Sequence, residues 1–301
     1  MKNILTAVVF FLMTNTVFAE QINIIVTGST KGSTNAIAQL IAKDSQSGKF
    51  NGIKLNAIAP GNACKGFALV KQQNGNTFVT HYENYYQLVA KMKNDPACPY
   101  VSFENAKPIV SKVQGLYLVV NTNGQGTELD KFSNTKLKIG YSGSSDVEKG
   151  WHNQLNKAFG NNHVFVGYNG SSKMRAGIAS GEVDAVWTTY SHYLRLTKQK
   201  DQYKILLRTL PELEVDAPIL AQHFDNKKLT RAFLGTWYVF NDKDNIAKII
   251  SKSLEQDFKN NTGEFGTYAN NKKLILFFDQ QTQVDMEKTL SWGQYSSEPN
   301  G

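Results

Sequence analysis

The sequence lacks any long hydrophobic segment beyond its first residues. There, Lys2 precedes an apolar stretch, Ile4–Met13, and the small-residue sequence Val17-Phe18-Ala19 follows. This order is typical of a secretory signal peptide, and the stretch is short for a membrane span, which needs about 20 apolar residues. An uncleaved anchor is the alternative. We expect residues 1–19 to be removed and the mature chain to be soluble outside the cytoplasm.

The chain also lacks any dense basic segment. Its formal net charge is +8, which becomes 8 − 1 = +7 once Lys2 is removed, yet no five consecutive residues are lysine or arginine. A positive surface suits nucleic acid, an anionic membrane or small acidic solutes, and scattered charge disfavours the first two. We therefore expect no nucleic-acid partner. The 301 residues, of which 41% are hydrophobic, are enough for one large or two ordinary domains with a real core.

Motifs of reaction chemistry are missing as well. No phosphate-binding loop, dinucleotide fingerprint or GxSxG elbow occurs, and "GYSGSSD" misses the last by its spacing. Asp242 and Asp244 fit a solvated turn. We expect no catalytic residue, no cofactor and no metal; a hydrolase or transferase on an α/β scaffold is the alternative from another class. The chain has five histidines, His81, His152, His163, His192 and His223, and they show no metal-binding spacing. Surface or turn positions explain them, except that His81, in "VTHY", falls in a loop after a predicted strand and is kept as a site candidate.

Cysteine is scarce, and both residues, Cys64 and Cys98, survive signal removal. In an oxidising compartment they can pair, and Cys98 sits in the turn-rich "NDPACPY", where a cross-link is useful. Closing such a loop stabilises the fold by roughly 4 kcal/mol in the chain-entropy model. We predict the disulfide; two buried free thiols are the alternative.

What the chain does contain is an alternation of strand and helix patterns. This alternation predicts α/β layers rather than a helical bundle or a β-sandwich. The predicted strands are Ile22–Val26, Ile53–Ala59, Thr77–Thr80, Leu116–Asn121, Lys138–Tyr141, His163–Gly167, Ala185–Thr188, Lys204–Leu207 and Trp237–Phe240. The predicted helices are Thr34–Lys43, Tyr85–Lys93, Ser145–Phe159, Ser172–Ser180 and Ile246–Asn260.

Strands end repeatedly in small polar residues before a helix begins, as in "TGSTKGSTN", "THYENYYQ", "GYSGSSDVEKG" and "GYNGSSKMRAG". In open α/β sheets ligands bind beyond the carboxyl ends of strands, where helix N-termini offer N–H groups and a positive dipole end. Four such junctions predict a cradle for a small anion.

Several segments resemble the substrate-binding proteins of tripartite tricarboxylate transporters, the Bug family. The segment "VFVGYNGSSKMRAGIASGEVDAVWTT" is similar to that family's strand, Tyr-x-Gly-Ser loop, helix and Gly-Glu-Val-Asp-Ala element. "LKIGYSGSSD" is similar to the preceding strand and loop, and "WYVFNDKDNIAKII" to the return strand and C-terminal helix. The resemblance runs from Ile22 to about Trp292. The first loop departs from it, because Asn35 stands where the family commonly has an acidic residue.

The resemblance implies an α/β, periplasmic binding protein-like fold, with two α/β lobes around a central ligand cleft. It places lobe one at 20–122 plus 236–301 and lobe two at 123–235. Independently of the resemblance, "NTNGQGTELDKF" follows the predicted strand that ends at Asn121, and we expect it to be a crossing between domains. It implies a monomeric, periplasmic solute-binding protein, not an enzyme, that captures a small carboxylate ligand for delivery to a membrane permease. A ligand-sensing protein that feeds a receptor is the alternative.

The candidate ligand-binding residues come from these loops. Lys31 has a solvated loop lysine as its alternative, and Asp184 a turn-capping role. The complete set is Ser29, Thr30, Lys31, Ser33, Thr34, Thr80, His81, Tyr82, Ser142, Ser144, Ser145, Tyr168, Asn169, Ser171, Ser172, Asp184 and Thr188.

Overall fold

A computed structural model describes most of the chain between residues 21 and 279. The described ranges are 21–28, 30–83, 95–103, 105–124, 126–142, 146–160, 163–198, 202–210, 215–226 and 229–279. The predicted signal peptide and the predicted helix Tyr85–Lys93 lie outside these ranges.

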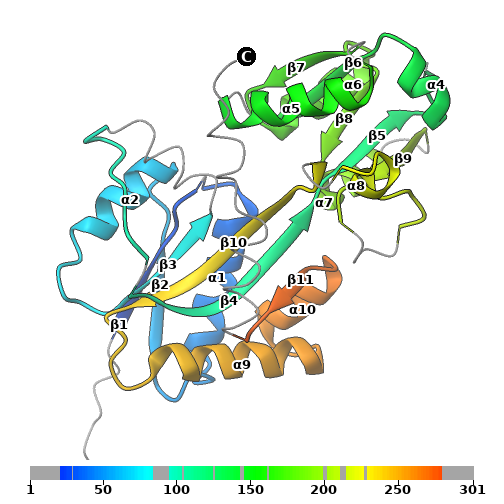
Figure 1. Ribbon diagram of the computed structural model, residues 1–301. Helices are drawn as coiled ribbons and strands as arrows, with labels where there is room; N and C mark the ends of the chain where they lie inside the picture. Colours follow the sequence, from blue (N-terminus) through cyan, green and yellow to red (C-terminus); the bar gives the residue numbers. More distant parts are fainter. Residues whose placement is uncertain are drawn as a thin grey trace, which may run out of the picture.

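The described chain forms two mixed β-sheets, each covered by helices, and these make two lobes (Figure 1). The first sheet has the strand order β11-β4-β10-β3-β1-β2. Its strands are β1 (Gln21–Ile25), β2 (Lys54–Ile58), β3 (Phe78–Glu83), β4 (Lys107–Gly115), β10 (Ala232–Phe240) and β11 (Ile275–Phe277).

Helices pack on both faces of the first sheet. Apolar residues of α1 and α9, such as Ile41 and Leu254, are buried against Trp237 and Val79 on one face. On the other face, Phe67 of α2 packs on Phe78. The helices of this lobe are α1 (Ser33–Gln46), α2 (Ala63–Lys71), α9 (Ile246–Asn260) and α10 (Gly263–Asn271).

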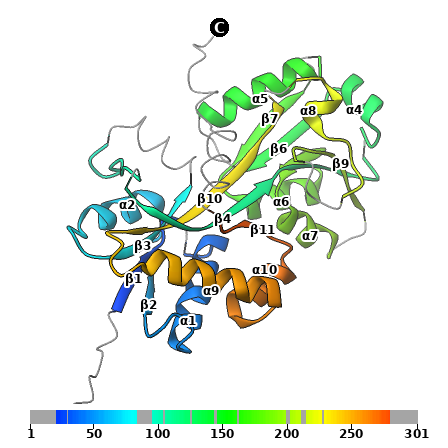
Figure 2. The same cartoon turned by 60° about the horizontal axis from the view of Figure 1, so that its bottom comes forward.

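The second sheet has the order β7-β6-β8-β5-β9. Helix α5 covers one face of this sheet and α6 the other (Figure 2). Trp151 of α5 packs with Trp187, and Met174 of α6 packs with Val186. Its strands are β5 (Tyr117–Asn121), β6 (Lys138–Ser142), β7 (Val164–Tyr168), β8 (Ala185–Thr188) and β9 (Tyr203–Arg208). Its helices are α4 (Leu129–Asn134), α5 (Asp146–Ala158), α6 (Ser171–Ser180), α7 (Tyr190–Thr197) and α8 (Leu220–His223).

The chain changes sheet at a single residue, Leu116, between β4 and β5. Its backbone exchanges two hydrogen bonds with Thr209: the Leu116 N–H donates to Thr209 Oγ1 (2.8 Å), and the Thr209 N–H donates to Leu116 O (2.9 Å). β10 returns the chain to the first sheet at Ala232. The predicted crossing, residues 121–132, runs from β5 to α4. Both of these elements belong to the second lobe. The lobe limits at 122 and 236 stay a prediction.

All nine predicted strands have a counterpart in the structure, but β4 and β11 were not predicted. β4 reads "KPIVSKVQG", and its polar residues hide the strand pattern. Ser111 of β4 is buried, and the cost of burying its hydroxyl is offset by a hydrogen bond of 2.7 Å with Thr236 Oγ1 of β10. A neighbouring strand thus makes a buried polar residue acceptable, and no local pattern shows that partner.

The predicted disulfide is present: Cys64, in the first turn of α2, is bonded to Cys98. Helix α2 lies close to the chain that follows β1, because a Cβ on Gly66 would stand 2.9 Å from both Thr27 Cα and Val26 O. Glycine is therefore required here by close approach rather than by its own conformation.

Among the residues that the structure describes, no helix combines the length and the apolar character needed to cross a bilayer.

Candidate functional site

The two sheets meet at Leu116. Each sheet faces this point with the end at which its parallel strands finish, and we call this end its carboxyl edge. In the first sheet β1 and β3 are parallel, and β10 is antiparallel to both β3 and β4, so β1, β3 and β4 end at one edge. In the second sheet β6, β7 and β8 are parallel, and β5 begins at their carboxyl edge, where Tyr117 lies opposite Thr188. Because one residue joins β4 to β5, these two edges face each other, and this is the place where α/β sheets bind ligands.

Helices α1, α6 and α7 begin at these edges with uncapped N-termini. Their N-cap residues, Gly32, Gly170 and Thr189, accept no side-chain capping bond, and none of the three has an acidic residue in its first turn. Helix α10 shows the contrast, because the buried carboxylate of Asp44 accepts from two backbone N–H groups at its start, both at 2.9 Å. N–H donors and a positive dipole end therefore remain available at the facing edges, as an anion site requires.

The first-lobe half of the site contains a buried lysine. Lys112 of β4 is 7% exposed, and its Nζ lies 3.5 Å from Ser33 Oγ in the first turn of α1. Lys112 pairs across the sheet with Gly235 of β10, and a Cβ on Gly235 would collide with the His81 ring. The absence of a side chain at Gly235 thus makes room for His81 beside Lys112.

His81 is neutral in this environment. The residue is 2% exposed, and its ring lies 4.8 Å from the ring of Trp237. Burial, and then the charge of Lys112, hold the pKa of His81 well below its usual value. Its Nδ1 has no hydrogen-bond partner among the described residues. A neutral imidazole and an ammonium group therefore lie together at the start of α1.

The second-lobe half contains an arginine between two helices. Arg175 of α6 places Nη1 2.7 Å from His192 Nδ1 of α7 and donates from Nη2 to Ser172 Oγ at 3.2 Å. Both partners lie in the first turns of their helices. Thr188, the last residue of β8, is 3% exposed, and its Oγ1 has no hydrogen-bond partner in the described chain. Each half therefore combines a cation, an uncapped helix start and a buried polar atom without a partner.

The structure brings the predicted loop residues to these facing edges. Residues 30–34 and the last residues of β6 and β7 are exposed or half-buried there, and Asn35 closes the first loop by donating to Thr30 O at 2.7 Å. The predicted residues placed at the two edges are Thr30, Lys31, Ser33, Thr34, His81, Ser142, Asn169, Ser171, Ser172 and Thr188. Ser29, Ser144 and Ser145 lie outside the described residues.

Two predicted residues of β3 are used within the first lobe. The Thr80 hydroxyl donates to Ile25 O at 2.8 Å and so joins β3 to β1. The Tyr82 ring packs against Phe103 and Tyr238, with centroids 4.6 and 6.0 Å away. Both side chains point to the α2 face of the sheet, opposite to His81, because neighbouring strand residues alternate between faces.

Two further predicted residues point away from the second-lobe edge. A Cβ on Gly140 or Gly177 would meet the Tyr168 ring, and burial, then the neighbouring Glu182, raise the pKa of Tyr168. Its hydroxyl therefore lies toward the C-terminal end of α6. Asp184 accepts from the Lys138 N–H at 2.8 Å, at the start of β6 and hence at the opposite edge of the sheet. This position fits the alternative structural role for Asp184.

The expectation of surface or turn positions for the other histidines holds for His223, which is exposed, and is wrong for two others. His152 stacks on Phe165, with centroids 4.7 Å apart, and His163 lies 4.7 Å from the ring of Phe132. Burial lowers the pKa of both imidazoles, so each behaves as an aromatic core residue.

Sequence reasoning missed Lys112, Arg175 and His192. Arg175 is part of the segment "GYNGSSKMRAG", but only the hydroxyl groups of that segment were predicted to bind the ligand. Lys112 was missed together with β4, and His192 was treated as an isolated histidine. The one available signal was a lysine on the same strand face as Val110, where an apolar residue is expected.

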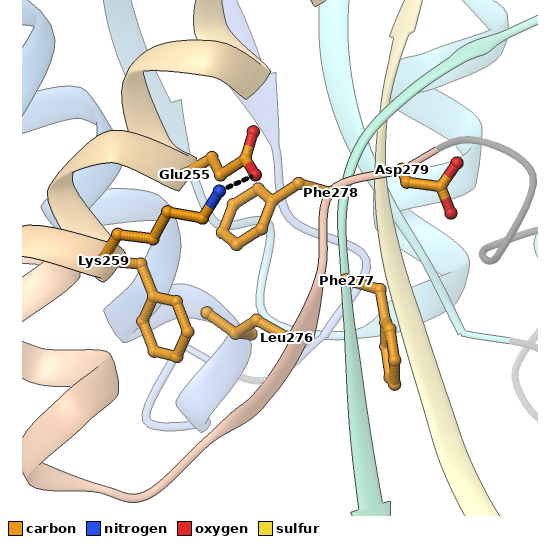
Figure 3. Close-up of a pocket in the computed structure, with 7 residues that line it drawn as sticks. Glu255, Lys259, Leu276, Phe277, Phe278 and Asp279 are labelled. Carbon is orange, nitrogen blue, oxygen red and sulfur yellow. Dashed lines mark hydrogen bonds and ion pairs between the residues drawn. The ribbon is translucent and has the colours of Figure 1, made fainter.

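The described residues contain no cluster of histidine, cysteine, aspartate or glutamate that could hold a metal ion. A cavity of about 260 Å³ lies on the first lobe, between α9 and the end of β11, and is lined mainly by apolar side chains (Figure 3). Its rim carries the Lys259–Glu255 ion pair, with Nζ and Oε1 2.6 Å apart. Because β11 runs antiparallel to β4, its end, where the cavity lies, points away from the facing edges.

Comparison with known proteins identifies the fold. No protein-family model and no curated protein matches the sequence. A TctC solute-binding protein from Polaromonas has a similar structure, with a TM-score of 0.66, 13% identity and coverage of 94% of this chain and 100% of that chain. MatC from Rhodopseudomonas palustris with bound malate gives 0.63 and 13%, with coverages of 92% and 99%. Another R. palustris protein, with adipate, gives 0.65 and 13%, with coverages of 92% and 96%.

At this level of identity the similarity shows the fold. The chain has the two-lobed, periplasmic binding protein-like fold of the TctC and Bug solute-binding proteins, as the sequence predicts.

Proposed function

We propose that the protein is a periplasmic solute-binding protein that captures a small carboxylate between its lobes and delivers it to the permease of a tripartite tricarboxylate-type transporter. The observation that carries this proposal is the pair of facing sheet edges. Each edge presents uncapped helix N-termini together with a cation, Lys112 in the first lobe and Arg175 in the second.

A carboxylate fits these groups in size and charge. Hydrogen bonds to charged acceptors contribute about 1.5–3 kcal/mol each, so four or five of them support micromolar binding after the ordering cost is subtracted. Structurally similar proteins hold malate and adipate, which are both carboxylates. The fold itself does not select a ligand, and the support for an anion therefore comes from the residues of this chain.

The position of the protein in the cell follows from its expected signal peptide. Residues 1–19 have the pattern of a cleaved leader, and a disulfide joins Cys64 to Cys98, as suits an oxidising compartment. A monomer with one ligand per chain is sufficient, since both halves of the site come from one chain. Delivery to a receptor is the alternative to delivery to a permease, because both use the same fold.

One observation favours an enzymatic alternative. Ser33 Oγ and Lys112 Nζ are 3.5 Å apart, and serine–lysine pairs can act as nucleophile and base. The distance is longer than the roughly 2.6–3.2 Å at which a base takes a proton. Binding therefore fits the pair better than hydrolysis. Release of nitrophenol from p-nitrophenyl acetate, with loss of that activity in Ser33→Ala, would support the hydrolase.

The test of the proposal begins with mass spectrometry of the small molecules that copurify with the native protein. Calorimetric titration with mono-, di- and tricarboxylates follows, and we expect one saturable site per chain without consumption of the ligand. Small-angle scattering should show a more compact chain when the site is filled, since a clamp closes by making contacts on its second lobe. Chemical conversion of the bound carboxylate by pure protein would contradict the proposal.

A further inference from the structure

Arg175 occupies a position that is electrostatically costly for a cation without an anion beside it. Its guanidinium joins the first turns of α6 and α7 through Ser172 and His192, so it lies at the positive ends of two helix dipoles. Burial, and then the charge of Arg195, lower the pKa of Arg175. Among the described residues no carboxylate forms an ion pair with Arg175, in contrast to Lys49, whose Nζ lies 2.9 Å from Asp257.

His192 holds this guanidinium in place. A guanidinium can only donate hydrogen bonds, so the 2.7 Å contact requires His192 Nδ1 to accept, and the ring must be neutral. Burial, then Arg175 and Arg195, lower the pKa of His192 to about 4, which keeps the ring neutral at pH 7. The two contacts of Arg175 involve Nη1 and Nη2, and a guanidinium has five N–H donors. Donors therefore remain for an anion.

Thr188 is an independent sign of a missing acceptor. It follows Val186 by two residues on β8, so its side chain points to the same face, where Val186 packs with Met174 of α6. The residue is 3% exposed, and its buried hydroxyl lacks a partner in the described chain. Buried hydroxyls are nearly always hydrogen-bonded, so an atom of a ligand is expected beside this one.

We infer that Arg175 is the specificity-determining residue of the second lobe, and that it binds one anionic group of the ligand directly through its guanidinium. His192 is a positioning residue that holds the guanidinium from α7, and Thr188 donates its hydroxyl to the same group. This inference rests on the proposed function. It adds that the second lobe selects a fully charged group rather than a neutral amide or an ammonium.

The test compares pairs of probes that differ by one charge. We would titrate the wild type and its variants with malate and with each straight-chain dicarboxylate from malonate to adipate. The half-amide of each diacid, in which one carboxylate is a neutral amide, serves as its partner probe. We expect Arg175→Gln to weaken the tightest dicarboxylate by about 10- to 100-fold, the value of a lost charged hydrogen bond. The ratio between the affinities for this dicarboxylate and for its half-amide should also decrease. A merely structural role of Arg175 would leave that ratio unchanged.

Two matched variants control for charge. Lys173→Gln removes one positive charge from an exposed position of the same helix, and Arg195→Gln removes the neighbouring cation. Both should bind within about threefold of the wild type, because exposed charges contribute little.

Variants of His192 test the positioning role. His192→Asn keeps an acceptor near the place of Nδ1 and should bind like the wild type, whereas His192→Leu removes the acceptor and should bind more weakly. Arg175→Lys keeps the charge without the fork and should be intermediate. If Arg175→Gln does not fold, as judged by circular dichroism, Arg175→Lys and His192→Leu carry the test.

The outcomes separate this inference from the proposed function. A folded Arg175→Gln that binds a dicarboxylate as tightly as the wild type would overturn the inference and leave the proposed function standing. If no probe binds the wild type, the proposed function falls and the inference falls with it.

Discussion

The substitution Gly66→Ala should lower the stability of the first lobe and should also disturb its ligand-binding loop. In a helix without close neighbours, Gly→Ala stabilises by about 1 kcal/mol, because alanine loses less backbone entropy. Here a Cβ would lie 2.9 Å from Thr27 Cα and 2.9 Å from Val26 O, both of them backbone atoms that cannot rotate away. Overpacking of this kind costs about 1–3 kcal/mol, so we expect Gly66→Ala to destabilise by up to about 2 kcal/mol.

The displacement should reach the site as well. Thr27 donates from Oγ1 to His81 O at 2.6 Å and directly precedes the loop that begins α1. A shift of α2 away from Thr27, or of Thr27 away from α2, therefore disturbs the first-lobe half. We expect Gly66→Ala to weaken carboxylate binding in addition to lowering the melting temperature.

Thermal unfolding and calorimetric titration of Gly66→Ala and of Lys65→Ala measure these effects. Lys65 is the exposed neighbour on α2, and its substitution should change stability by less than about 0.5 kcal/mol. A Gly66→Ala variant that melts higher than the wild type would show that helix propensity exceeds the contact cost, and would refute the close approach of α2 to Thr27.

Three further predictions concern the disulfide, the buried lysine and acid. Reducing the Cys64–Cys98 bond should cost up to roughly 4 kcal/mol and lower the melting temperature without abolishing the fold; an unchanged melting curve after complete reduction would contradict it. Lys112→Met should weaken carboxylate binding by about 10- to 100-fold, whereas Lys107→Met, at an exposed position of the same strand, should not; equal affinities of the two variants would exclude Lys112 from the site. The pKa of buried His81 is depressed in the folded protein, so protons bind preferentially to the unfolded chain. As the pH falls below 6.5, this histidine should therefore lower the free energy of unfolding by up to about 1.4 kcal/mol per pH unit. Urea titrations with equal midpoints at pH 7 and pH 5 would contradict this prediction.

Nine of the strands and several of the longer helices could be predicted from the sequence alone, because each of these rests on a local pattern. The short apolar run of β8, which is buried along its whole length, and the amphipathic spacing of α9 define these elements without reference to the rest of the chain, and both were predicted with their observed bounds. The polar junctions were also local, so the sequence located most of the loops that lie at the facing edges. Cysteine scarcity and an expected oxidising compartment were enough to predict the disulfide.

Only the tertiary structure decided which polar residues meet. Ser111 and Lys112 conceal β4 in the sequence, and they are acceptable there because Thr236 and Ser33 approach from elements far away in the chain. Arg175 and His192 belong to different helices and come together through the packing of α6 against α7.

The fate of Asp184 was likewise a question of tertiary structure. It depended on which end of β6 its carboxylate reaches, and that end is the one opposite to the ligand edge. Periodicity specifies the face of an element that is buried, but the partner of a buried charge is a long-range contact that no local pattern encodes. The cations of the candidate site could therefore be identified only from the fold, whereas its loops could be identified from the sequence.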